Sequence, residues 1–138
     1  MVKAGALAGV RVLDLADESA AFTGRILADL GAEVILIEAP EGGRLRHRAP
    51  FLHGRPNPEH AIGHLYYNAN KRSLVLDPTD PGRRADFERL IASADVLIET
   101  AAVAEREVLR LDDPGLRALN PRLIHASITP FGPDGPWR

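Results

Sequence analysis

Three arginines after Pro40 are spaced as a group that could bind an anion. Arg44, Arg46 and Arg48 alternate along the chain, and alternate side chains of an extended backbone point the same way. A guanidinium forms paired hydrogen bonds with phosphate or carboxylate groups. The segment therefore predicts either an anion-binding loop or a solvated basic loop.

Five histidines raise the question of a metal site. His60 and His64 stand four residues apart, which can place two ligands on one face of a helix, but Gly63 lies between them and the acidic residue of the zinc-protease motif is missing. The chain has no cysteine, so thiolate ligands and nucleophiles are excluded. We expect no metal site, and we interpret His125 as a strand residue that faces a helix or solvent.

The elements that position these residues begin with a repeating unit in residues 9–40. Val10–Leu15 is a short apolar run and Val34–Ile37 is an unbroken one, and between them apolar residues recur at helical spacing over Phe22–Leu30. Continuous apolar strands joined by a helix indicate a parallel sheet covered on both faces. The loop Ala16–Ala20 contains no glycine, so the phosphate-binding fingerprint of dinucleotide folds is absent.

The rest of the chain repeats this alternation. The expected strands cover residues 73–77, 96–98 and 123–128, and the expected helices cover residues 81–93 and 114–119, with a loop and a short helix within residues 99–110. We therefore predict a single α/β domain over residues 1–138, with a Rossmann-like parallel sheet of about five strands, helices on both faces and a long loop at about 40–65. The turn-rich end predicts a sheet that is incomplete at the C-terminus.

Composition limits the partners that we expect. The formal net charge of −2 argues against a nucleic-acid binder. No signal-like segment opens the chain and no apolar run is long enough to span a bilayer. We expect a cytoplasmic protein that contacts neither nucleic acid nor membrane.

Six stretches resemble the family III CoA-transferases, which include formyl-CoA and carnitine CoA-transferases and the related 2-methylacyl-CoA racemases. They occur in family order and spacing over nearly the whole chain. The stretches are Leu7–Leu15, Leu27–Glu38, Asn68–Asp77, Ala94–Glu99, Asn120–Ile124 and Phe131–Pro136.

The resemblance implies a large Rossmann-like domain that holds coenzyme A, in dimeric enzymes that move CoA between carboxylic acids. In the transferases an aspartate attacks the acyl-CoA, and in the racemases a His and Asp pair moves the α-proton. Both kinds of catalytic residue follow the Phe131–Pro136 turn in the family. We therefore expect no catalytic residue and no transferase turnover from these 138 residues alone, and we interpret Asp14, Asp77 and Asp95 as strand-end or helix-cap carboxylates.

CoA contacts in the family cluster in the loops after the first, third and fourth strands and in the following short helix. Carried over to this chain, they fall at nine positions. These are Glu18, Ser19, Leu76, Asp77, Thr79, Thr100, Ala101, Arg110 and Leu111. Apolar side chains can flank adenine, and an arginine, here Arg110, can pair with a phosphate.

The chain departs from the family pattern in two of these regions. Ala20-Ala21-Phe22 replaces the family's Ala-Gly-Pro, and Thr100-Ala101 replaces an Asn followed by an aromatic residue or Arg. The Gly-rich turn that follows is replaced by Ala102-Val103-Ala104. These changes predict weakened CoA affinity.

Three hypotheses about function follow. The first is the N-terminal CoA-binding portion of a family III CoA-transferase, which would bind CoA or acyl-CoA as a homodimer or in association with the rest of the enzyme. The second is a noncatalytic stand-alone α/β module that binds a partner protein. The third is another nucleotide-binding protein, with Arg44, Arg46 and Arg48 as its phosphate site.

Overall fold

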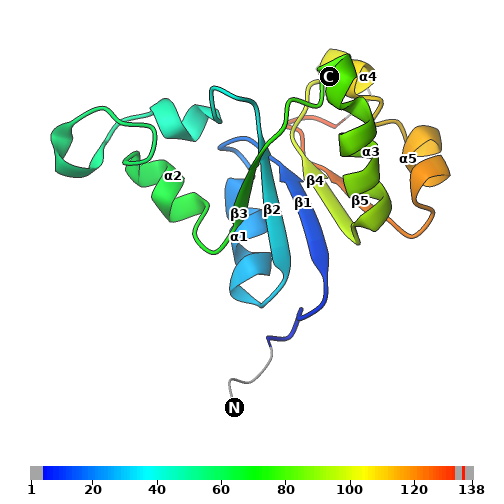
Figure 1. Cartoon of the computed structure of the whole chain (residues 1–138), viewed down its shortest axis with the longest axis horizontal. Coiled ribbons are helices and arrows are strands. Elements are labelled where there is room, and N and C mark those ends of the chain that lie inside the picture. Colours follow the sequence, from blue (N-terminus) through cyan, green and yellow to red (C-terminus); the bar gives the residue numbers. More distant parts are fainter. Residues whose placement is uncertain (1–4, 133–134, 136–138) are drawn as a thin grey trace.

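The computed structural model describes residues 5–132 and residue 135, and strands and helices alternate along the chain (Figure 1). The strands are β1 (Arg11–Leu15), β2 (Glu33–Glu38), β3 (Arg72–Val75), β4 (Val96–Glu99) and β5 (Ile124–Ser127). The α-helices are α1 (Ala21–Asp29), α2 (Ile62–Tyr67), α3 (Arg84–Ser93), α4 (Val103–Leu109) and α5 (Asp113–Leu119). Half of the predicted turn Phe131–Pro136, residues 133, 134 and 136, lies outside the described residues.

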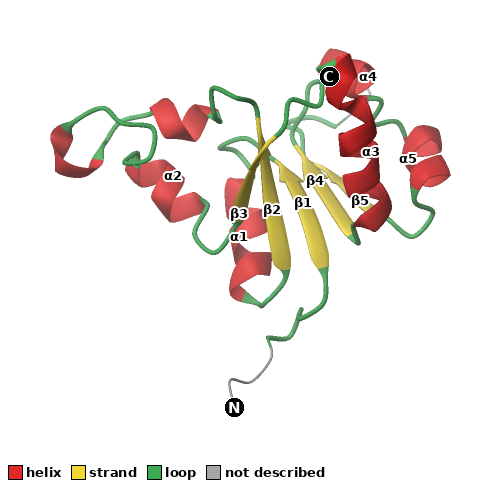
Figure 2. Ribbon diagram, in the orientation of Figure 1, coloured by secondary structure: helices red, strands yellow, loops and turns green. Residues whose placement is uncertain are grey.

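The five strands form one parallel sheet in the order β3-β2-β1-β4-β5 (Figure 2). The chain first moves outward from β1 to β3 and then crosses back to β4, on the other side of β1. The order therefore reverses between β1 and β4, and ligands of such sheets bind at the carboxyl ends of the strands around that point.

Successive residues of each strand face opposite layers of the core. Val12, Val34 and Ile98 pack against α1 on one face. Leu13 and Leu97 pack against α3 and α5 on the other face, where Phe87 is fully buried. The predicted α/β class with helices on both faces is thus confirmed.

The region predicted as a long loop at about 40–65 contains more regular structure than the sequence indicates. Short 3-10 helices occupy Arg44–His47 and Leu52–Gly54, and α2 begins at Ile62. Helix α2 was not predicted because it has only six residues, among them Gly63, and follows a stretch rich in Pro, Gly and His. No helix in the described part of the chain is both long enough and apolar enough to cross a membrane.

A buried ion pair joins the central strand to the loop before β3. Lys71 Nζ lies 2.7 Å from Asp14 Oδ2, with both side chains almost fully buried. The same ammonium donates hydrogen bonds to the Ala21 carbonyl in α1 and to Asn68 Oδ1. Asp14 is therefore one partner of a buried ion pair, a role that the sequence did not indicate. Asp77 and Asp95 accept hydrogen bonds from the backbone N–H groups of Thr79 and Arg11.

Gly24 makes room for this ion pair under α1. A Cβ atom at position 24 would overlap the Asp14 carboxylate and lie 3.1 Å from Lys71 Cε. We expect Gly24→Ala to destabilise the fold by roughly 1–3 kcal/mol, the usual cost of overpacking a core, as measured by urea unfolding.

The matched control is Gly63→Ala in α2. A Cβ there makes only a 3.4 Å contact with Leu45, and alanine favours a helix over glycine by up to about 1 kcal/mol. Equal unfolding midpoints for the two variants would contradict the account of Gly24.

Candidate functional site

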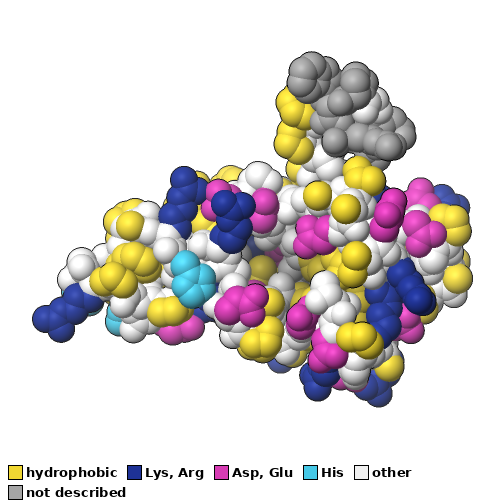
Figure 3. Space-filling model, turned by 90° about the horizontal axis from the view of Figure 1, so that it is seen from above, with side chains coloured by type: hydrophobic (Ala, Val, Ile, Leu, Met, Phe, Trp, Pro, Cys, Tyr) yellow, Lys and Arg dark blue, Asp and Glu magenta, His cyan; other side chains and the backbone are white. Residues whose placement is uncertain are grey.

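The carboxyl edge of the sheet brings together loops that are far apart in the sequence. Seen from above in Figure 3, this edge has acidic side chains around its middle. The loops after β1 and β4 meet here directly, because the Asp17 N–H donates a hydrogen bond to Thr100 Oγ1 at 2.9 Å. This contact closes the point where the strand order reverses.

Glu99 holds the turn that follows β4. Its side chain is fully buried, and its Oε2 accepts the Ala101 N–H at 2.6 Å. Its Oε1 lies 3.2 Å from His125 Nε2 and 3.4 Å from Arg106 Nε. Burial alone would raise the pKa of Glu99, but hydrogen bonds from His125 and Ala101, with the charge of Arg106, lower the pKa below its ordinary value.

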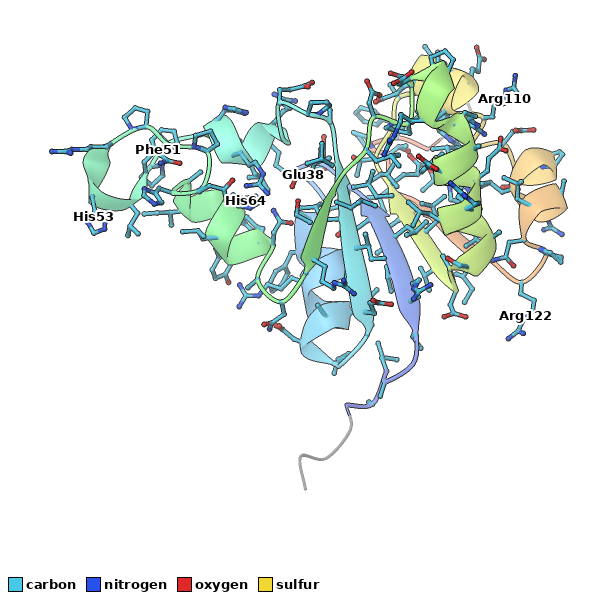
Figure 4. All side chains as sticks on the ribbon, in the orientation of Figure 1. Glu38, Phe51, His53, His64, Arg110 and Arg122 are labelled. Carbon is cyan, nitrogen blue, oxygen red and sulfur yellow. The ribbon has the colours of Figure 1, made fainter. Side chains whose placement is uncertain are left out.

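Glu38 holds the turn that follows β2, as Glu99 holds the turn that follows β4. Arg46 donates two hydrogen bonds to its carboxylate, from Nε at 2.8 Å and from Nη2 at 2.7 Å, and the Gly43 N–H and Ser73 hydroxyl also donate to it. Burial would raise the pKa of Glu38, but these donors outweigh it and lower the pKa to about 2. Figure 4 shows Glu38 at the top of β2, between the sheet and α2.

A cleft of about 490 Å³ opens between these two carboxylate-held turns. We call it the central cleft. Leu15, Ile37 and Leu109 give it apolar walls, while Thr79 and Thr100 add hydroxyl groups. Five carboxylate residues line it, namely Asp17, Glu41, Asp77, Glu99 and Glu105, and Arg44 is the one basic residue among its described lining residues.

The structure brings six of the nine predicted CoA contacts to this edge. Asp77, Thr79, Thr100 and Ala101 line the central cleft. Ser19 lines an adjoining cleft of about 790 Å³ that also includes Thr100 and Ala101. Glu18 lies next to them and forms an ion pair with Arg48 at 2.8 Å.

The other three predicted contacts lie elsewhere. Leu76 and Leu111 are buried in the core, so only their backbone groups could face a ligand. Arg110 follows α4 in a left-handed conformation and lines a pocket with Val103 and Glu107, two residues that also line the cleft of about 790 Å³. Figure 4 shows Arg110 at the far right of the molecule, well away from Glu38.

The three alternating arginines do not form one site. The expectation that they point the same way was wrong, because Arg44–His47 is a 3-10 helix and not an extended segment. Arg46 is buried against Glu38 and Glu59, and Arg48 pairs with Glu18. Only Arg44 lines the central cleft.

Sequence reasoning missed Glu38 and Glu99 as organisers of this edge. The signal was present, since Leu-Ile-Glu occurs both at residues 36–38 and at residues 97–99, each time at the end of an apolar run. His125 was expected to face a helix or solvent. It does face α5, with Nδ1 3.6 Å from Asp113, but it also contacts Glu99.

Comparison with known proteins gives a consistent result. The family model described as CoA-transferase family III matches residues 7–138. Succinate–glutarate CoA-transferase of Agrobacterium fabrum is 43% identical over 137 residues, which cover 95% of this chain and 34% of that protein. Succinyl-CoA:(R)-benzylsuccinate CoA-transferase subunit BbsE of Thauera aromatica is 36% identical over 126 residues, covering 91% of this chain and 31% of that protein.

Solved structures show the same fold. A CAIB/BAIF family protein from Brucella suis superposes with a TM-score of 0.86 at 36% identity, over 98% of this chain and 36% of that chain. Rv3272 from M. tuberculosis gives a TM-score of 0.84 at 37% identity, over 97% of this chain and 37% of that one. The chain thus spans about a third of the length of the curated relatives it matches.

The lowered pKa of Glu38 predicts a pH-dependent contribution to stability. Because the folded pKa of about 2 lies below the ordinary value of 4.5, the contribution is fully present above about pH 4.5 and is lost as the pH falls toward 2. We expect Glu38→Gln to lower the free energy of unfolding by about 3 kcal/mol at pH 7 and by much less at pH 3, in urea titrations. An equal loss of unfolding free energy at pH 7 and at pH 3 would contradict this explanation. Glu41→Gln, at an exposed position, serves as the control.

Glu99→Gln tests the second turn. The variant leaves Arg106 and His125 without the buried carboxylate that both contact, and removing one partner of a buried pair costs about 3 kcal/mol or more. Glu107→Gln, an exposed change on α4, should shift stability by less than about 0.5 kcal/mol in the same urea titration. If Glu99→Gln is as stable as Glu107→Gln, Glu99 does not hold this turn.

Proposed function

The chain belongs to CoA-transferase family III, and from this premise we propose that it forms the N-terminal CoA-binding portion of an enzyme that transfers CoA between carboxylic acids. It acts as a homodimer or together with the remaining two thirds of the family polypeptide. The observation that carries the proposal is the central cleft, where Asp77, Thr79, Thr100 and Ala101 meet from the ends of two strands. These are positions at which the family resemblance expects CoA.

The cleft suits an adenine nucleotide in its mixture of surfaces. Leu15, Ile37 and Leu109 can pack against the faces of a purine, and loop backbone groups can hydrogen-bond to its edge. Thr79 and Thr100 line the cleft, and their hydroxyl groups can hydrogen-bond to a ribose. Ligand pockets generally combine apolar walls with a few such polar groups.

The substrate class follows from the relatives by analogy. The names of the similar proteins from Agrobacterium fabrum and Thauera aromatica describe CoA transfer involving succinate, glutarate and benzylsuccinate. We propose CoA thioesters of carboxylic acids as the substrates of the complete enzyme. The choice of acid depends on the parts of the enzyme beyond this third.

The proposal is tested by titrating CoA into the purified chain by calorimetry. We expect saturable 1:1 binding, and no acyl exchange between CoA esters by the same sample. Thr79→Trp fills the central cleft from an exposed position and should abolish the binding heat.

Thr23→Trp, also exposed but on the outer part of α1, is the matched control and should bind CoA as the wild type does. Absence of CoA heat at millimolar concentration in the folded wild-type chain would contradict the proposed function. Equal loss in both variants would show that the central cleft is not the site.

A further inference from the structure

Among Arg44, Arg46 and Arg48, only Arg44 lines the central cleft. It starts the 3-10 helix Arg44–His47 that follows β2, and its exposed side chain lines the central cleft. It also lines an adjoining hollow of about 540 Å³ with Arg48 and His47. Its side chain therefore stands where the two depressions meet.

The neighbouring arginines already form ion pairs with carboxylates. Arg46 is buried in its paired contact with Glu38, and Arg48 pairs with Glu18 at 2.8 Å. Arg44 makes no hydrogen bond or ion pair within the part of the chain that the structure describes. All five of its N–H donors remain available to a ligand.

Two of the five carboxylates that line the cleft bind neighbouring turn groups rather than Arg44. Asp17 accepts the Ser19 N–H and hydroxyl, and Asp77 accepts those of Thr79. Both therefore serve as turn residues. The Arg44 guanidinium nevertheless acts at this distance, because its charge contributes to lowering the pKa of Asp17, after the larger effects of burial, which opposes it, and of the Ser19 and Thr100 hydrogen bonds.

We propose that Arg44 is the phosphate ligand of the CoA site. The inference rests on the proposed function and deepens it by naming the side chain that recognises the anionic part of the ligand. CoA carries three phosphate groups, and the central cleft has no other basic residue among its described lining residues. The planar guanidinium can donate two parallel hydrogen bonds to a phosphate.

This assignment replaces the one that the sequence favoured. Arg110 was expected to pair with a phosphate, but it lies at the C-terminal end of α4 beside Arg106 and Glu107, in a pocket that shares no lining residue with the central cleft. The two arginines are therefore a natural pair for comparison, each replaced by alanine in the full chain.

The experiment measures binding of CoA and of adenosine, which has no phosphate, by calorimetry to the wild type, Arg44→Ala, Arg44→Lys and Arg110→Ala. We expect Arg44→Ala to weaken CoA binding about tenfold to a hundredfold with adenosine binding unchanged, and Arg110→Ala to change CoA binding less than about twofold. Arg44→Lys should recover part of the loss, because an ammonium supplies charge without the paired geometry. Raised salt should weaken CoA binding to the wild type more than to Arg44→Ala.

Two outcomes overturn the inference and can be told apart. If wild-type chain binds CoA and Arg44→Ala binds it equally well, Arg44 is not the phosphate ligand while the proposed function stands. If the folded wild type binds no CoA, the proposed function fails and the inference with it. Circular dichroism of each variant distinguishes a loss of binding from a loss of fold. Arg44 is exposed, so we expect its replacement to change stability little.

Discussion

The arrangement of the sheet depends on the buried ion pair between Asp14 and Lys71. An ionised carboxylate and an ammonium are costly to bury, and the pair is tolerated only when further hydrogen bonds satisfy it. Lys71 meets this condition through the Ala21 carbonyl and Asn68, and Asp14 through the Ala16 N–H. Burial raises the pKa of Asp14, and Lys71 opposes that rise.

Three elements are fixed by this one contact. Helix α1 must pass close above β1, which requires Gly24 at the crossing. The loop before β3 must end near Asp14, which places β3 beside β2. The Ala16 N–H must turn back toward the strand, which sets the course of the loop after β1.

The carboxyl edge then receives its shape from a second layer of buried carboxylates, Glu38 and Glu99, whose backbone contacts hold the neighbouring turns. A site held in this way loses little conformational freedom when a ligand binds.

The sequence predicted those features that local patterns encode. The apolar run 10–15 covers β1 and begins one residue before it, and the runs 34–37 and 96–98 fall within β2 and β4. Phe87 and Ile91 mark the buried face of α3. Helix α2 was not predicted because it is short and contains Gly63, although Ile62, Leu65 and Tyr66 have helical spacing. These three apolar side chains are exposed.

Long-range pairings could not be read in the same way. Nothing local connects Lys71 to Asp14 across 57 residues or His125 to Glu99 across 26. The prediction for the arginine segment was wrong because it assumed an extended chain. Arg46 binds Glu38 from within a 3-10 helix, and alternate side chains of a helix do not point the same way. Leu109 at the end of α4 lines the central cleft, whereas Arg110, the next residue, lines the neighbouring pocket, and the sequence alone did not show this division.

Backbone amide NMR of the labelled chain during a CoA titration tests whether the carboxyl edge around the reversal of strand order is a CoA site. If CoA binds there, the largest shifts occur in the three loops at residues 16–20, 77–80 and 100–102 and at Arg44, with little change on the outer side of α1 and α2. Shifts centred on the Arg110 pocket or on α1 and α2, or none at saturating CoA, would contradict it.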